Sequence, residues 1–166
     1  GKNLIAFQTF RWCDGTYLED QDFLRLCGVG RDCYLYTRNP KYIQDIRVTP
    51  DLDAQYKDAT LNVSVNLKGS GVVDVKLLDK QGNSVAITTL KGSGKVSADI
   101  AVSNPLKWTA ETPNLYTLVA TLKEGNKELE VIPVKVGFRK IELKNSQILV
   151  NGQPVLFKGA DRHEMD

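Results

Sequence analysis

The chain has 166 residues, of which 42% are hydrophobic and 25% are charged, and this composition is typical of a folded globular protein. Its formal net charge of +2, without a basic run or a basic face carrying aromatic side chains, excludes nucleic acid as an expected partner. No apolar stretch approaches the roughly 20 residues of a membrane-spanning helix, so we expect no membrane partner either.

Residues 1–37 predict strands whose partners are not found in the same segment. Residues 3–11 carry apolar side chains on both alternating faces, which indicates a strand covered from two sides. A second short strand is expected at residues 33–36. The turn-forming residues 38–40 follow it, and we place a domain boundary there.

Residues 38–137 predict an all-β domain, an immunoglobulin-like antiparallel β-sandwich of about seven strands. Apolar and polar residues alternate with a period of two, as in strands with one face in the core. Residues 68–71 and 92–94, both rich in glycine, are interpreted as turns, the first closing a hairpin. Pro133 lies inside a strand pattern and predicts an edge strand or a bulge. The expected strands are residues 43–48, 59–67, 72–78, 84–90, 96–102, 115–122 and 129–136.

The irregular connection at residues 103–114 contains Trp108, which we expect to cap one end of the sandwich core.

Residues 138–166 follow a different pattern. A hairpin is expected over residues 148–156, because an Asn-Gly pair at its centre favours a tight turn. Residues 157–160 predict a strand that finishes in a polar cluster, and we interpret this strand as the start of a further domain that is cut off.

Two clusters of polar side chains are candidate binding or catalytic sites. Glu19, Asp20 and Asp22 place three carboxylates within four residues, which fits either a hard cation and sugar hydroxyls or a solvated acidic turn. His163, the only histidine, lies in a polar cluster after a strand, where barrel enzymes place their sites; a solvated terminus is the alternative.

Other reactive side chains give no recognisable site. Cys13, Cys27 and Cys33 show no zinc-binding spacing, so we expect reduced thiols that pack within the fold. No serine, threonine or cysteine nucleophile has a recognisable base beside it. The Gly-Ser-Gly runs open no helix and are therefore not interpreted as phosphate loops.

Three ordered blocks of sequence resemble the β-galactosidases of glycoside hydrolase family 2. RWCDGTYLEDQDF and LCGVGRDCYL, within residues 1–37, resemble the end of that family's jelly-roll sugar-binding domain. NPLKW, ETPNLY and VGFR, which fall in or next to residues 38–137, resemble its immunoglobulin-like domain and the exit from it. NGQP and KGADRHE, within residues 138–166, are similar to the start of its (β/α)8 catalytic barrel.

The resemblance implies roles for individual residues. Asp22 matches an aspartate that contacts the galactose and a bound sodium ion, and His163 matches a barrel histidine that touches substrate hydroxyls. Asp161 stands where many members have asparagine, and Cys13 where serine is frequent. For the complete enzyme, the resemblance implies a β-galactoside substrate, sodium and magnesium, a homo-oligomer, and retention of configuration by two glutamates located beyond Asp166.

The sequence thus predicts a non-catalytic portion of a β-galactosidase, which holds the sugar-binding domain against the barrel and is inactive by itself. The alternative is a stand-alone carbohydrate-binding or adhesion module of the immunoglobulin type. It accounts for the sandwich, but not for the strand expected at residues 3–11 or for the abrupt end of the chain.

Overall fold

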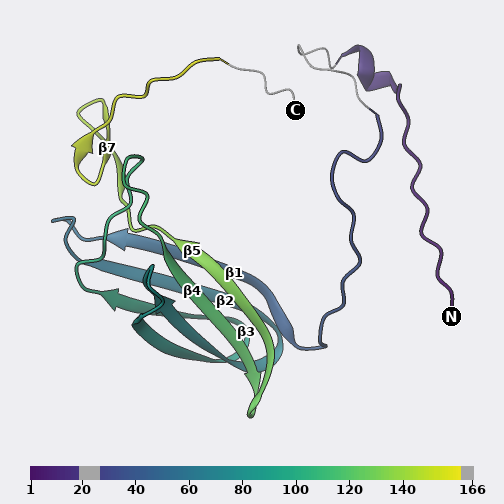
Figure 1. Cartoon of the computed structure of the whole chain (residues 1–166), viewed down its shortest axis with the longest axis horizontal. Coiled ribbons are helices and arrows are strands. Elements are labelled where there is room, and N and C mark those ends of the chain that lie inside the picture. The colour runs from purple at the N-terminus through teal and green to yellow at the C-terminus, as the bar shows by residue number, and fades with distance from the viewer. Residues whose placement is uncertain (19–26, 162–166) are drawn as a thin grey trace. The chain divides into compact units, whose positions relative to one another are not determined.

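The computed structural model describes residues 1–18 and 27–161, and it divides into two compact units, Gly1–Thr37 and Arg38–Asp166. The fold is all-β, as predicted (Figure 1). Among the described residues, no helix has the length and hydrophobicity needed to cross a membrane. The second unit contains the strands β1 (Tyr42–Leu52), β2 (Ala59–Leu78), β3 (Ser84–Val102), β4 (Tyr116–Glu124), β5 (Lys127–Val136), β6 (Ile141–Lys144), β7 (Gln147–Val150) and β8 (Gln153–Pro154).

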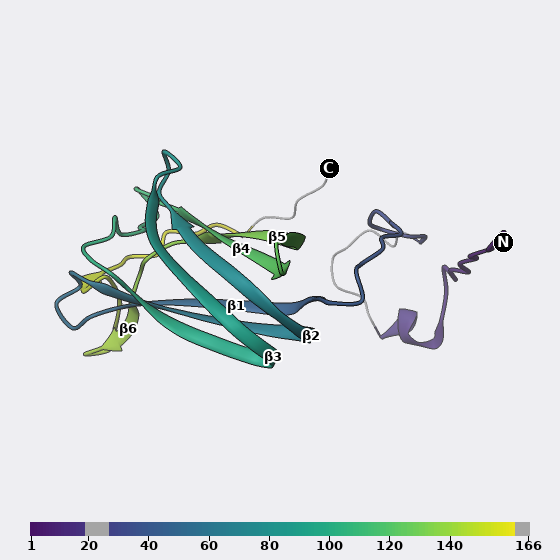
Figure 2. The same cartoon turned by 90° about the horizontal axis from the view of Figure 1, so that it is seen from below.

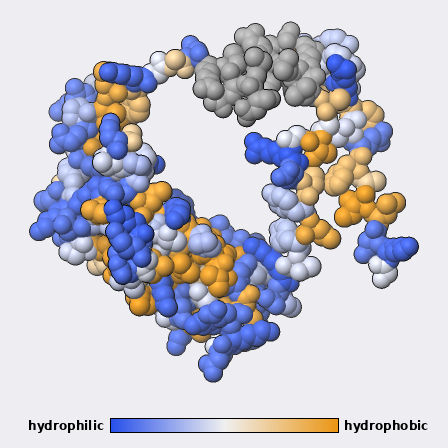
Figure 3. Space-filling view, in the orientation of Figure 1, coloured by the Kyte–Doolittle hydropathy of each residue, from blue (hydrophilic) through white to orange (hydrophobic). Residues whose placement is uncertain are grey.

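The unit Gly1–Thr37 has one 3-10 helix, η1 (Asp14–Tyr17), and no strand in its described part. The strands predicted at residues 3–11 and 33–36 are therefore wrong. A strand is stable only with a hydrogen-bonded neighbour, and apolar alternation alone does not supply one. The side chains that suggested these strands are exposed, Leu4 by 94% for example, and Figure 3 shows hydrophobic surface along this unit.

The five longest strands form one hydrogen-bonded sheet that folds over itself into two layers (Figure 2). β3 is antiparallel to β2 along its whole length, whereas the other edge of β2 pairs first with β1 and then with β4. One layer is therefore β1, the first half of β2 and the second half of β3. The other is the first half of β3, the second half of β2, β4 and β5. These seven strand segments confirm the predicted sandwich.

Residues 68–71 and 92–94 bend their strands and do not reverse them, so the hairpin and the turn predicted there are wrong. The pairing moves from Leu67 opposite Gly94 to Ser70 opposite Ser93, which leaves two extra residues in β2. Such a bulge bends a strand sharply without ending it. An even number of extra residues also preserves the alternation, so the same face of β2 stays inside on both sides of the bend.

Glycine makes the bend possible at two positions of β2. Gly69 has a φ of +86°, a conformation that other residues rarely adopt. Gly71 approaches β4 so closely that a Cβ atom there would lie 2.7 Å from Leu122 Cδ1. Side chains larger than hydrogen are therefore disfavoured where the two layers meet.

The core lies between the two layers and is built from both halves of the bent strands. Pro133 lies in β5, the last strand in the order β1-β2-β4-β5, which confirms the predicted edge position. Tyr116 and Phe138 close one end of the core with an edge-to-face contact at 5.1 Å between ring centroids. Fully buried core residues are Ile43, Leu52, Leu61, Val63, Val65, Val73, Val75, Leu77, Leu118, Ala120, Leu122 and Phe138.

A second, three-stranded sheet of β6, β7 and β8 follows the sandwich. The predicted Asn151-Gly152 turn joins β7 to β8, and both residues have positive φ, as the tight turn requires. The sequence did not predict β6, which pairs with β7 through a turn at Asn145 and Ser146. Residues 157–160, expected as a strand, form none in this structure.

Candidate functional site

The residues that the sequence singled out for substrate and metal binding lie outside the described residues. These are Asp22, with its acidic neighbours Glu19 and Asp20, and His163. Asp161 is described and is exposed. In residues 1–18 and 27–161, no three histidine, cysteine or acidic side chains gather where they could hold a metal ion.

The cysteines are exposed, so the expectation that they pack within the fold is wrong for this structure. Cys13 Sγ lies 3.4 Å from Thr16 Oγ1 beside η1, and Cys33 Sγ donates to Arg31 O at 3.9 Å. Both contacts are local, and the described residues of this unit, 1–18 and 27–37, include no buried side chain.

In the part of the chain that the structure describes, polar contacts join the sandwich to its adjoining segments in two places. In the first place, side chains and backbone of residues 38–43 make polar contacts with β5. Glu130 accepts a hydrogen bond from Ile43 N at 2.7 Å through Oε2, and its Oε1 lies 3.4 Å from Arg38 Nη2. Asn39 Nδ2 also donates to Leu129 O at 3.1 Å. The chain that precedes β1 therefore enters the sandwich through a fixed path across the edge of β5.

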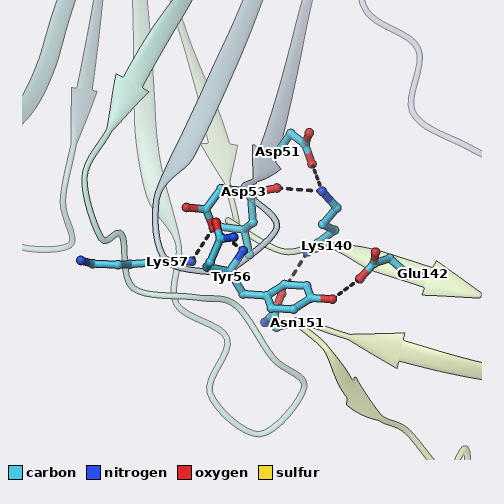
Figure 4. A network of polar contacts seen from close by, with 9 residues as sticks. Asp51, Asp53, Tyr56, Lys57, Lys140, Glu142 and Asn151 are labelled. Atoms are coloured by element: carbon cyan, nitrogen blue, oxygen red, sulfur yellow. Dashed lines mark hydrogen bonds and ion pairs between the residues drawn. The ribbon is translucent and has the colours of Figure 1, made fainter. Parts of the chain in front are cut away.

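The second place begins with the β1–β2 loop, which is organised by the Asp53 carboxylate (Figure 4). Asp53 accepts hydrogen bonds from the backbone amides of Gln55, Lys57 and Asp58 at 2.8 to 3.1 Å. These amides, that of Lys57 first, hold the pKa of Asp53 below its usual value. The closed loop forces Tyr56 to a φ of +55°, which is rare for a bulky side chain.

Tyr56 reaches from this loop to the β6–β8 sheet. Its hydroxyl donates to Glu142 Oε2 at 2.5 Å, across 86 positions in sequence. The Glu142 carboxylate raises the pKa of Tyr56, first through this hydrogen bond and further through its negative charge. The tyrosine ring lies against the β7–β8 turn, where a Cβ atom on Gly152 would come within 2.6 Å of Tyr56 Cε2.

Lys140 and Asn151 form a second link between the same two sheets (Figure 4). Lys140 Nζ donates to Leu52 O at 2.8 Å and lies 3.4 Å from Asp51 Oδ1 at the end of β1. The Lys140 backbone exchanges hydrogen bonds with Asn151, whose Nδ2 donates to Trp108 O at 3.1 Å. Asn151 thus joins the turn, the start of β6 and the 103–114 connection.

Trp108 is half-buried at this end of the sandwich, which agrees with the predicted cap. Its backbone nitrogen donates to Phe138 O at 2.8 Å, and the Arg139 guanidinium lies 4.5 Å from the centre of its ring. A hollow of about 370 Å³ opens beside it. The hollow is lined by Pro50, Trp108, Leu115, Gly137, Arg139 and Ile141.

The two holding places lie at opposite ends of β1. Ile43 takes part in the first and Leu52 in the second. Since a strand rises about 3.3 Å per residue, the nine steps between them span about 30 Å. The arrangement can therefore hold two chain segments at a fixed separation. The polar contacts that do this link residues up to 90 positions apart, and no local sequence pattern identifies them.

Comparison with known families and proteins agrees with this fold. Residues 41–139 match the family described as glycosyl hydrolases family 2, and residues 1–39 match its sugar binding domain. A β-galactosidase of Pseudoalteromonas haloplanktis is 41% identical over 99% of the chain, and one of Priestia megaterium is 38% identical over all of it. The chain spans 17% of the length of each of these relatives.

Solved structures show the same architecture. A β-glucuronidase of Bifidobacterium dentium, complexed with coumarin-3-O-glucuronide, has a TM-score of 0.65 and 28% identity over 72% of this chain and 21% of that one. A β-glucuronidase of Ruminococcus gnavus has a TM-score of 0.63 and 30% identity over 72% of this chain and 19% of the other. This chain belongs to glycosyl hydrolase family 2, as its sequence motifs predicted.

Proposed function

We propose that this chain is the central, non-catalytic portion of a β-galactosidase that hydrolyses terminal β-D-galactosides with retention of configuration. The observation that carries the proposal is the 38–41% identity to curated β-galactosidases across practically the whole chain. Because the chain spans only 17% of those enzymes, its role is one part of a larger catalytic protein. The two catalytic glutamates belong to a barrel of roughly 250 residues downstream.

The work of this portion is positioning. The sandwich fastens residues 38–43 at one end of β1 and the β6–β8 sheet at the other, about 30 Å away by strand rise. We propose that the contacts of residues 38–43 hold the sugar-binding domain and that the contacts of the β6–β8 sheet hold the barrel. Catalytic groups gain large rate factors only when they are held in the right geometry, so a stiff spacer contributes to catalysis without touching substrate.

Within the complete enzyme, we propose Asp22 and His163 as substrate-binding residues, with Asp22 also a ligand of a sodium ion. Support comes only from their positions in the family motifs, since both lie outside the described residues. The magnesium ion and the homo-oligomer implied for the complete enzyme rest on the same family resemblance. Dependence of galactoside hydrolysis on sodium, weakened by Asp22→Asn, is the expected outcome, and an unchanged dependence contradicts the assignment.

A β-glucuronide is the second candidate substrate, because the solved structures named above are β-glucuronidases. Their identity to this chain, 28–30%, is lower than that of the curated β-galactosidases, so we favour the galactoside. A binding module without activity is the third candidate, and it is supported only by the sandwich itself.

Hydrolysis of chromogenic β-galactosides and β-glucuronides, measured side by side, tests the proposal. The purified chain and the full natural polypeptide that contains it are compared. We expect hydrolysis of the galactoside by the full polypeptide alone. Glucuronide hydrolysis would select the second candidate, and a folded, inactive full polypeptide that binds galactosides would select the third. Turnover by the 166-residue chain itself would contradict its assignment as non-catalytic.

A further inference from the structure

Tyr56 combines two properties that rarely occur together. Its φ of +55° is unfavourable for an aromatic residue, yet its side chain is fully engaged, with the ring against Gly152 and the hydroxyl on Glu142. Strained backbone persists where the surrounding structure requires it. Here the loop that imposes the strain is closed by three hydrogen bonds from backbone amides to the Asp53 carboxylate, and the phenol points at the β6–β8 sheet.

The two partners of Tyr56 lie in different parts of that sheet. Glu142 is in β6, and Gly152 is in the turn between β7 and β8. One side chain therefore touches both an edge strand and the turn of a three-stranded sheet. The Lys140 contacts restrain only the start of β6, next to the sandwich, and Asn151 restrains the turn. Tyr56 adds a contact between the sandwich and the body of β6, beyond those made by Lys140 and Asn151.

The sheet in turn directs the chain that follows it. Val155 N donates to Ile148 O at 3.0 Å, so the backbone leaves β8 still hydrogen-bonded to β7. His163 follows eight residues later in the sequence. An error in the orientation of β7 therefore changes the direction in which the chain leaves the sheet at Val155.

We propose that Tyr56, acting through Glu142 and Gly152, is a positioning residue that sets the orientation of the β6–β8 sheet, and with it the chain leading to His163. The inference deepens the proposed function and, for its catalytic consequence, rests on it. Tyr56 touches neither substrate nor reacting atoms in this proposal. Its effect is to keep the barrel's first segment in the orientation that the sandwich dictates.

Amide hydrogen exchange on the 166-residue chain tests the structural half. Tyr56→Phe removes the hydroxyl, and Tyr56→Gly removes the ring as well while suiting the positive φ. We expect the amides of Asn151 and Val155 to exchange about fivefold faster in Tyr56→Phe, the effect of one lost hydrogen bond, and faster still in Tyr56→Gly. The β2 amides should be unchanged. Unchanged exchange at Asn151 and Val155 would overturn the proposal.

The matched control is Tyr116→Phe. Tyr116 also uses its hydroxyl, which accepts a hydrogen bond from Leu106 N at 2.9 Å, but it lies in β4 and contacts the sandwich core. We expect this variant to lower the melting temperature without raising exchange selectively in β7 and β8. Selective acceleration there by Tyr116→Phe would also overturn the proposal, since the effect would not belong to Tyr56.

Steady-state kinetics of the full natural polypeptide test the catalytic half. With a chromogenic β-galactoside, Tyr56→Phe should lower kcat/KM about tenfold at temperatures well below its melting temperature, where the protein is fully folded, because misplacing a site by a fraction of an ångström is costly. Tyr116→Phe should lower the melting temperature at unchanged kcat/KM. Faster exchange with unchanged kcat/KM would overturn the positioning role. Absence of galactoside hydrolysis in the parent overturns the proposed function, and the exchange pattern still decides whether Tyr56 orients the sheet.

Discussion

Lys123 Nζ lies 2.9 Å from Asp74 Oδ2 and joins β4 to β2 on the outside of the sandwich. Asp74 Oδ1 also accepts a hydrogen bond from Thr89 Oγ1 of β3 at 2.9 Å, so one carboxylate connects three strands of one layer. The Lys123 hydrogen bond, and then that of Thr89, hold the pKa of Asp74 below its usual value.

This lowered pKa predicts a loss of stability in acid. The contribution of Asp74 is complete above the pKa it has in the unfolded chain, about 3.9, and disappears as the pH falls through the lower folded value. Asp74→Asn should lower the free energy of unfolding at neutral pH by about 0.5 to 1 kcal/mol. Urea unfolding at neutral pH and in acid measures both effects. A variant with the same acid dependence as the parent would contradict the pKa assignment.

The Tyr56 phenol predicts the opposite dependence at alkaline pH. Because Glu142 raises its pKa, its contribution is complete below the ordinary tyrosine pKa of about 10 and is lost as the pH rises through the folded value. The parent chain should therefore lose stability more steeply than Tyr56→Phe as the pH rises above about 10. Denaturant unfolding across this range measures the difference, and parallel curves would show that the phenol gains nothing from Glu142.

Gly71→Ala tests the close approach of β2 to β4. Its Cβ would lie 2.7 Å from Leu122 Cδ1, and we expect a loss of about 1 to 3 kcal/mol, as for other overpacked cores. Leu122→Val removes the opposing methyl and should recover part of that loss in the double variant. Additive losses in the two variants, measured by urea unfolding, would show that the methyl is not the obstacle.

Trp108→Ala tests the cap at the end of the sandwich. A fully buried tryptophan costs about 3 to 5 kcal/mol when truncated, so this half-buried one should cost about 2 to 3 kcal/mol. KM of the full enzyme for a β-galactoside should not change. A large change in KM without a change in melting temperature would place Trp108 in a binding surface.

The sequence pattern predicted those parts of the fold that depend on near neighbours. Alternation identified the strand segments, Pro133 identified an edge strand, and Asn151-Gly152 identified a turn, because each is a property of consecutive residues. The bend at residues 68–71 escaped prediction for a physical reason. Both a glycine-rich reversal and a bulge with two extra residues leave apolar and polar residues alternating in the same way before and after them. Only the pairing of β2 with β3 shows that this segment is a bulge.

The polar contacts at the two ends of β1 could not be predicted from the sequence, for a different reason. Tyr56 and Glu142 are 86 positions apart, and Ile43 and Glu130 are 87 apart, and none of these residues lies in a recognisable motif. The rare φ of Tyr56 arises from the Asp53 loop and not from the tyrosine itself. Family resemblance singled out Asp22 and His163, because motif positions can be matched without knowledge of their contacts, and both assignments stay predictions.

The two bent strands have a mechanical consequence. In a sandwich whose layers meet only through side chains, one sheet can slide over the other as those side chains repack. Here β2 and β3 run through both layers, so sliding would require breaking the backbone ladder that β2 and β3 share. The two layers are therefore connected by covalent chain and paired backbone as well as by the packing of their side chains.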